Sequence, residues 1–147
     1  MDLKSYISGY VDGEGCFCIS INKSSRHSFG WELRPSFSVS QNSDRSEVLR
    51  LLKQYFTCGS IRPDISDKTL KFEIRSINDL VHKVLPHFED TKLISAKQND
   101  FKYFAKACRL MYSKKHLTKD GFNGVLDLAF KMNPSGKRKH LRHEIKI

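Results

Sequence analysis

The sequence predicts a single α+β domain whose elements follow the order αββαββα, with further helices at the C-terminal end. Two pairs of segments, 16–23 with 31–41 and 60–65 with 69–76, alternate apolar and polar residues, as half-buried antiparallel strands do. Apolar residues at helical spacing precede, separate and follow these pairs. The chain has 147 residues, 39% of them hydrophobic, which suits one domain with one core.

The first helix and the first strand pair follow from this spacing. Residues 3–13 predict a short helix, although Gly9 and Gly13 are unfavourable inside a helix and need a separate reason. Residues 16–23 then form a strand, and after a polar turn residues 31–41 form its partner. We expect a long two-stranded ribbon with one polar face.

The middle of the chain repeats the helix and the ribbon. Ser43 is a candidate N-cap for a helix whose apolar stripe reaches Phe56 and which Gly59 closes. The second ribbon comes next. A helix over residues 77–85 is expected to end near Pro86, because the position before a proline disfavours helical conformation.

Two further helices complete the packed part of the chain. Apolar residues recur at helical spacing over 101–111 and again over 122–130. We therefore expect one domain over residues 1–134, followed by a basic tail, 135–147. Two interpretations of that tail stay open: a frayed, solvated end or an arm that contacts phosphates.

Charge and composition restrict the class of partner. Lys and Arg number 26 against 16 Asp and Glu, a net charge of +10, which favours a polyanion such as nucleic acid or an anionic membrane surface. No apolar run could cross a bilayer, no helical face resembles a membrane anchor, and the N-terminus lacks the apolar block of a signal peptide. We expect an intracellular or organellar interior and no membrane partner. The four cysteines lack paired zinc-binding spacing and are expected to be reduced.

One segment carries a specific motif, Ile7-Ser8-Gly9-Tyr10-Val11-Asp12-Gly13-Glu14-Gly15, which Cys16 and Phe17 continue into a strand. It resembles the motif of the LAGLIDADG homing endonucleases, and the resemblance extends to about residue 132. This implies a saddle of antiparallel ribbons that binds DNA, and site-specific double-strand cleavage on behalf of a mobile intron or intein. It also implies an organellar (chloroplast or mitochondrial) or prokaryotic location.

The motif also has a physical interpretation. Gly9 and Gly13 lie on one helix face, where a second helix can approach closely. A carboxylate on Glu14 beside the phosphates of DNA requires a divalent cation between them. The Glu14 carboxylate and the Gly13 carbonyl would supply oxygen ligands, which suit Mg²⁺, and Mn²⁺ could substitute for it. Because the chain has one motif, cleavage of two strands implies a homodimer on a long pseudo-palindromic target, its interface formed by Gly9, Gly13, Tyr6 and Tyr10.

The resemblance assigns three further catalytic side chains. Gln41 and Arg45 fill positions where single-motif relatives keep a glutamine and an arginine near the scissile phosphate, and Lys97 matches the central lysine, with Lys92 as its rival. The alternatives are a loop amide, an exposed arginine and a solvated lysine. Position 14 holds Glu where many members have Asp.

The polar faces of the ribbons are expected to follow a major groove and meet base edges. The candidate DNA-binding residues on these faces are Ser20, Asn22, Glu32, Arg34, Ser36, Ser38, Arg62, Asp64, Lys71, Glu73 and Arg75. Two competing functions remain, an RNA-binding maturase that acts on its own intron RNA and a DNA-binding regulator with an inactive site.

Overall fold

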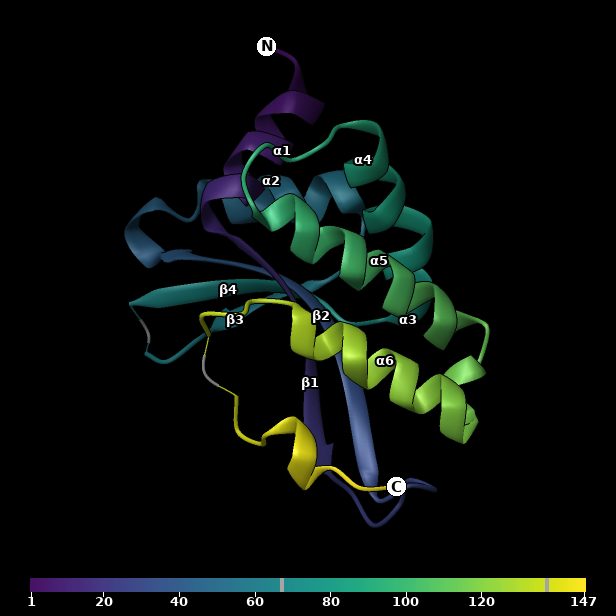
Figure 1. The fold of residues 1–147 in the computed structure, drawn as a ribbon. Helices are drawn as coiled ribbons and strands as arrows, with labels where there is room; N and C mark the ends of the chain where they lie inside the picture. Colours follow the sequence, from purple (N-terminus) through teal and green to yellow (C-terminus); the bar gives the residue numbers. More distant parts are fainter. Residues whose placement is uncertain (67, 137) are drawn as a thin grey trace.

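The computed structural model describes residues 1–66, 68–136 and 138–147 and contains one four-stranded antiparallel sheet (Figure 1). The strand order is β1-β2-β4-β3. The strands are β1 (Gly15–Lys23), β2 (Trp31–Asn42), β3 (Ser60–Pro63) and β4 (Thr69–Ile74). The two predicted ribbons therefore join edge to edge, because β2 also pairs with β4.

Helices cover one face of this sheet, and α5 and α6 cross in front of β1 and β2 in the view of Figure 1. The helices are α1 (Leu3–Glu14), α2 (Glu47–Phe56), α3 (Ile77–Asp79), α4 (Leu85–Asp90), α5 (Lys97–Tyr112) and α6 (Lys119–Lys131). The predicted order αββαββα with additional C-terminal helices is confirmed. No helix in the described ranges is long and apolar enough to cross a membrane.

The core lies between the sheet and the helices and is rich in phenylalanine. Phe17 of β1 stacks on Phe37 of β2 at a centroid distance of 5.2 Å, and its ring also meets Phe88 of α4 and Phe101 of α5. Alternation along each strand sends these side chains to the helical face. The opposite face of the sheet is left to polar side chains.

The helix predicted from Ser43 begins later. Residues 43–45 form a single 3₁₀ turn, and α2 starts at Glu47. The backbone N–H of Ser43 still donates to the Lys68 carbonyl at 2.8 Å, so this residue belongs to the end of the sheet. The helix then closes with Thr57 in the left-handed conformation, two residues before Gly59.

The expected helix end near Pro86 is wrong, because the helix continues to Asp90. A π-helical turn, Leu80–Val84, precedes the proline, and Pro86 then occupies the first turn of α4. A proline is tolerated in the first turn of an α-helix, and here that turn follows the change from π-helical to α-helical hydrogen bonding.

The end of the chain is packed against the domain, which contradicts the interpretation of a frayed, solvated end. Arg138 donates to the Ile19 carbonyl at 3.1 Å, and its guanidinium lies over the Phe130 ring. Arg142 contacts Asp127 of α6, and Ile145 is buried. The packed part of the chain therefore extends past residue 134, and residues 138–147 are not frayed; Lys137 lies outside the described residues.

Candidate functional site

The motif helix α1 ends where the sheet begins. Its buried side consists of Ile7, Ser8 and Val11. At the turn into β1, the Gly15 N–H bonds to the Val11 carbonyl, and a Cβ at this glycine would lie 2.6 Å from the Val11 side chain. The close turn requires a glycine there, and it leaves the Glu14 side chain exposed at the end of α1.

The other side of α1 has no partner within the described chain. A Cβ placed at Gly9 or Gly13 would meet nothing within 4 Å. Tyr6 and Tyr10, one helical turn apart, are half-buried with ring centroids 6.2 Å apart. Contacts inside this chain therefore give no reason for the two glycines.

Asp12, the other acid of the motif, is hydrogen-bonded to the loop that precedes α5. Its carboxylate accepts hydrogen bonds from the Ile94 and Ser95 N–H groups, at 3.1 Å each, and from the Ser95 hydroxyl at 2.5 Å. Burial raises the pKa of Asp12, but these hydrogen bonds outweigh burial and hold the pKa below its ordinary value. These hydrogen bonds fix the loop before α5 against α1, and no local pattern in the sequence signals them.

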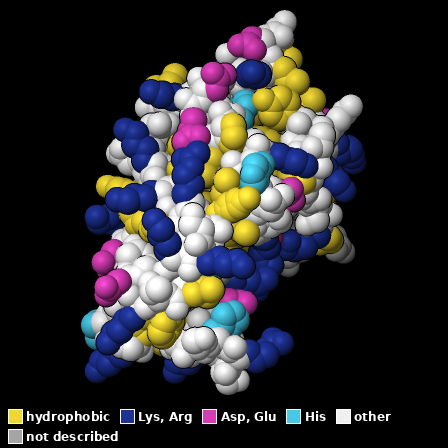
Figure 2. All heavy atoms as spheres, turned by 90° about the vertical axis from the view of Figure 1, so that its right-hand side faces the viewer, with side chains coloured by type: hydrophobic (Ala, Val, Ile, Leu, Met, Phe, Trp, Pro, Cys, Tyr) yellow, Lys and Arg dark blue, Asp and Glu magenta, His cyan; other side chains and the backbone are white. Residues whose placement is uncertain are grey.

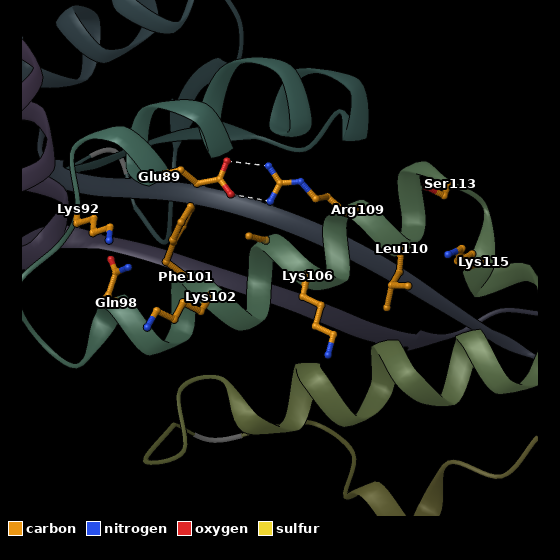
Figure 3. Close-up of a pocket in the computed structure, with 11 residues that line it drawn as sticks. Glu89, Lys92, Gln98, Phe101, Lys102, Lys106, Arg109, Leu110, Ser113 and Lys115 are labelled. Carbon is orange, nitrogen blue, oxygen red and sulfur yellow. Dashed lines mark hydrogen bonds and ion pairs between the residues drawn. The ribbon is translucent and has the colours of Figure 1, made fainter.

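Lys97 reaches the end of the motif helix, whereas Lys92 does not. The Lys97 ammonium group donates to the Val11 carbonyl at 3.0 Å. Lys92 instead lines a pocket of about 530 Å³ between α4 and α5, together with Gln98 and Lys102, as Figure 3 shows. Of the two candidate lysines, Lys97 is the one beside α1.

Gln41 at the end of β2 also contacts α1, while Arg45 stands apart. The Gln41 amide donates to the Tyr10 hydroxyl at 2.7 Å and accepts from the Asn42 N–H at 2.8 Å. Arg45 is exposed on the following turn, 3.7 Å from the carboxylate of Asp44. The structure thus gathers Lys97 and Gln41 around the last turns of α1 and leaves Arg45 facing solvent.

No cluster within the described ranges brings together three or more His, Cys, Asp or Glu side chains that could hold a metal ion. All four cysteines are free, as expected, although Cys16 and Cys18 lie next to each other on the polar face of β1. A hydrogen bond from Cys18, opposed by burial, lowers the pKa of the Cys16 thiol to about 7.

The predicted DNA-binding residues lie on the sheet face opposite the phenylalanine core. Cross-strand pairs join Ser20 to Arg34 and Asn22 to Glu32 between β1 and β2. On the other half of the sheet, Arg62 of β3 pairs with Lys71 of β4. Asp64 turns toward the same face, because the Ser40 hydroxyl donates to its carboxylate at 3.2 Å.

Three of these residues are less accessible than predicted. Ser36, Ser38 and Glu73 are buried, each no more than 6% exposed, although they lie on the expected face. Glu73 accepts from the Ser36 hydroxyl at 2.5 Å and from Arg62 at 2.7 Å. Glu73 lies on the predicted polar face but is not exposed there, because the neighbouring strands enclose its carboxylate between two partners.

These contacts also keep Glu73 charged. Burial raises the pKa of its carboxyl, but hydrogen bonds from Ser36 and Arg62 and the charge of Arg75 outweigh burial and lower the pKa below its ordinary value. The carboxylate therefore neutralises part of the positive charge that Arg62 and Arg75 bring to the polar face.

Basic side chains are not confined to the sheet. Figure 2 shows Lys and Arg spread over a side of the molecule with few Asp and Glu between them. This distribution agrees with the net charge of +10. An anionic partner would be attracted from several directions.

The chain matches the family model described as LAGLIDADG endonuclease over residues 7–108. It is 32% identical over 130 residues to the probable intron-encoded endonuclease 2 of Neurospora crassa, which covers 88% of this chain and 29% of the relative. This chain thus spans less than a third of that relative.

Solved structures share the fold. The homing endonuclease I-TnaI superposes with a TM-score of 0.83 at 34% identity and covers 90% of both chains. I-SmaMI, bound to its uncleaved DNA target in the presence of calcium ions, superposes with a TM-score of 0.89 at 30% identity. That match covers 96% of this chain and 48% of the I-SmaMI chain.

Proposed function

Because this chain belongs to the LAGLIDADG endonuclease family, we propose that it is a homing endonuclease that cleaves both strands of a long, pseudo-palindromic DNA site. One observation carries the proposal. The exposed carboxylate of Glu14 ends α1 at the start of the polar sheet face, with Lys97 held against the same helix end. A duplex on that face would bring its backbone to this carboxylate and this amine.

We further propose that the active form is a homodimer whose α1 helices pack on each other. The open space beside Gly9 and Gly13 supports this, because it admits a second helix at close range. The half-buried rings of Tyr6 and Tyr10 would flank the contact. The I-SmaMI chain supplies a comparison of size, since this chain matches about half of it (48%). Two copies would provide two carboxylates near one axis.

The donors near Glu14 suit a hard divalent cation. A carboxylate and a carbonyl at the C-terminal end of α1, such as that of Gly13, are oxygen ligands of the kind that Mg²⁺ or Mn²⁺ takes together with water. One carboxylate from each chain suits an ion that retains waters and also meets a phosphate. When bound, such an ion lowers the pKa of its water and offsets charge on the reacting phosphate.

The remaining side chains have roles that follow from their contacts. Lys97 uses one N–H on the Val11 carbonyl and keeps two to orient water or phosphate oxygens. Gln41 is held at both ends of its amide, by Tyr10 and by Asn42, and keeps a second N–H for the attacking water. Arg45, exposed on its turn, would neutralise the phosphate that gains charge.

We assign sequence recognition to the accessible polar face, with Arg34, Lys71 and Arg75 among its residues, and catalysis to the last turns of α1 and the side chains around them. The relative in Neurospora crassa is named as intron-encoded, which supports an origin in a mobile intron. An organellar or prokaryotic setting fits that origin.

Incubation of the purified chain with a library of linear DNAs and Mg²⁺, followed by sequencing of the ends, tests the proposal. We expect cuts at one related set of sites whose two halves are similar, as a symmetric dimer requires. A matched reaction with Ca²⁺ should give binding without cutting, because its looser coordination replaces Mg²⁺ poorly. Uncut DNA in Mg²⁺ together with specific retention of intron RNA would contradict the proposal and favour the maturase.

A further inference from the structure

The last residues of the chain form one wall of a trough beside the polar face of β1. The trough has a volume of about 340 Å³. Ser20 and Asn22 of β1 line one side, and Arg138, Lys139 and His140 line the other. In Figure 1 the C-terminal segment, drawn in yellow, runs beside β1 toward the β1–β2 turn.

This wall is held firmly against the edge of the sheet. Asn133 donates to the Phe17 carbonyl at 2.9 Å, and Arg138 donates to the Ile19 carbonyl and to the Ala129 carbonyl. Phe17 and Ile19 are alternate residues of an edge strand, so these contacts satisfy carbonyls that have no neighbouring strand on that side. These hydrogen bonds hold the wall beside β1.

Two groups on the wall lack partners in the described part of the chain. Lys139 is exposed, and no acidic group among the described residues pairs with its ammonium. His140 rests edge-on against Trp31 at a centroid distance of 4.9 Å, and its Nε2 is buried without a hydrogen-bond partner. Glu144 lies 3.8 Å from the other ring nitrogen, Nδ1. An anionic oxygen in the trough would supply the missing partner for these groups.

The opposite wall offers the donors that a phosphodiester accepts. Ser20 carries a hydroxyl and Asn22 an amide, and both already belong to the predicted DNA-binding face. Hydroxyl, amide, lysine and a helping histidine N–H are typical donors to backbone phosphates, which position a duplex without reading its sequence.

We propose that this trough binds one backbone phosphate of the DNA that lies on the sheet, so that the C-terminal segment extends the DNA contact beyond β1. The proposal rests on the proposed DNA-binding function and adds Lys139 and His140 to it. Both residues lie in the tail for which the sequence left a phosphate-contacting arm open, but the trough itself could not be predicted, because it depends on contacts with β1 more than a hundred residues away.

The test compares Lys139→Ala with Lys146→Ala, since both remove one exposed lysine from the C-terminal segment and only Lys139 lines the trough. Affinity for the mapped target is measured at several salt concentrations. We expect Lys139→Ala to reduce the slope of log affinity against log salt by about one per protomer and Lys146→Ala to leave it unchanged. His140→Phe, which keeps an aromatic ring beside Trp31, should weaken binding without changing the melting temperature.

Substitution of single phosphates by uncharged methylphosphonates locates the contact. One position in each half-site should reduce the affinity of the parental protein and have no effect on that of Lys139→Ala. Equal slopes for the two lysine variants, with the parental protein binding its target, would contradict phosphate binding in the trough. They would not contradict the proposed endonuclease function. A parental protein that neither binds nor cuts any DNA in the library would overturn both.

Discussion

The carboxylate of Asp12 on α1 holds the hydroxyl and the backbone N–H of Ser95, which lies 83 positions further along the chain. The Ser95 hydroxyl in turn accepts from the backbone N–H of Lys97 at 3.2 Å. The two acids of the motif therefore have different surroundings. Asp12 holds the segment just before α5, while Glu14 is exposed and carries the proposed catalytic role.

Glu14→Gln should abolish cleavage and leave specific DNA binding intact or slightly tighter. The amide keeps the shape of the side chain but removes the charge that would hold a divalent cation, and it also removes repulsion toward phosphate. The melting temperature should not change, because Glu14 is exposed. The measurement is cleavage of a mapped target in Mg²⁺ beside a binding titration in Ca²⁺. Cutting near the parental rate would remove Glu14 from the site.

Asp12→Ala is the matched contrast and should primarily lower stability. It leaves the exposed Ile94 and Ser95 N–H groups to water, and the net loss amounts to about 0.5–1.5 kcal/mol. The free energy of unfolding is measured in urea. Unchanged stability would show that the hydrogen bonds to Ser95 contribute nothing to the fold.

Gly9→Leu should convert the proposed dimer to monomers without unfolding them. A Cβ at this position meets nothing within 4 Å in the single chain, but a leucine would fill the space that the second α1 needs. Overpacking of this kind costs about 1–3 kcal/mol at each site. Sedimentation at micromolar concentration provides the measurement, with Gly124→Leu on α6, where a Cβ is equally free, as the control. A parental protein that sediments as a monomer would contradict the dimer.

The order of elements could be predicted because alternation and helical spacing are local properties of the sequence. The exceptions arise where distant contacts override a local rule. Pro86 does not end its helix because a π-helical turn precedes it. The C-terminal segment packs because Arg138 finds a carbonyl of β1 119 positions away. No periodicity in the last residues signals such a contact.

The candidate site was predictable to a similar degree. The position of Glu14 within the motif predicted that it lies at the end of the first helix. The sequence left Lys97 and Lys92 as alternatives, and in the structure Lys97 is the one that contacts the Val11 carbonyl. Alternation assigned Glu73 to the correct face of β4. It could not reveal that Ser36 and Arg62 enclose this carboxylate, because crowding depends on which side chains the neighbouring strands supply.

Glu73→Gln should increase the salt dependence of DNA binding. The neutral amide no longer offsets Arg62 and Arg75, so both guanidinium groups can meet phosphates, and the slope of log affinity against log salt should steepen by about one per protomer. Glu32→Gln, at a more exposed acid on the same face that pairs with Arg34, serves as the comparison. A slope unchanged by Glu73→Gln would show that Arg62 and Arg75 do not contact the DNA backbone.

Acid should weaken the packing of α1 through His87. The imidazole Nε2 meets the Ser8 hydroxyl at 3.0 Å, and Nδ1 meets the Tyr55 hydroxyl at 2.8 Å. Since the Ser8 hydroxyl donates to the Thr91 carbonyl, it accepts from His87 Nε2–H, and Nδ1 accepts from Tyr55; this network requires a neutral ring. Burial, aided by the charge of Lys4, lowers the pKa of His87 to about 4.

The direction of the pH effect follows from that shift. His87 has a pKa near its ordinary 6.5 in the unfolded chain and about 4 in the folded one, so below pH 6.5 the unfolded chain binds the extra proton. Its contribution to stability is complete above pH 6.5 and is lost as the pH falls toward 4. The free energy of unfolding in urea should therefore decline between pH 7 and pH 4.5.

His87→Gln separates this residue from other groups that titrate over the same interval. Burial also lowers the pKa of His116, so some decline must persist in the variant. The glutamine amide cannot take up a proton in this range, and the decline between pH 7 and pH 4.5 should be smaller than in the parental protein. Because Ser8 belongs to the motif helix, the proposed dimer should also weaken over this interval. Identical pH profiles for the two proteins would show that protonation of His87 does not weaken the packing of α1.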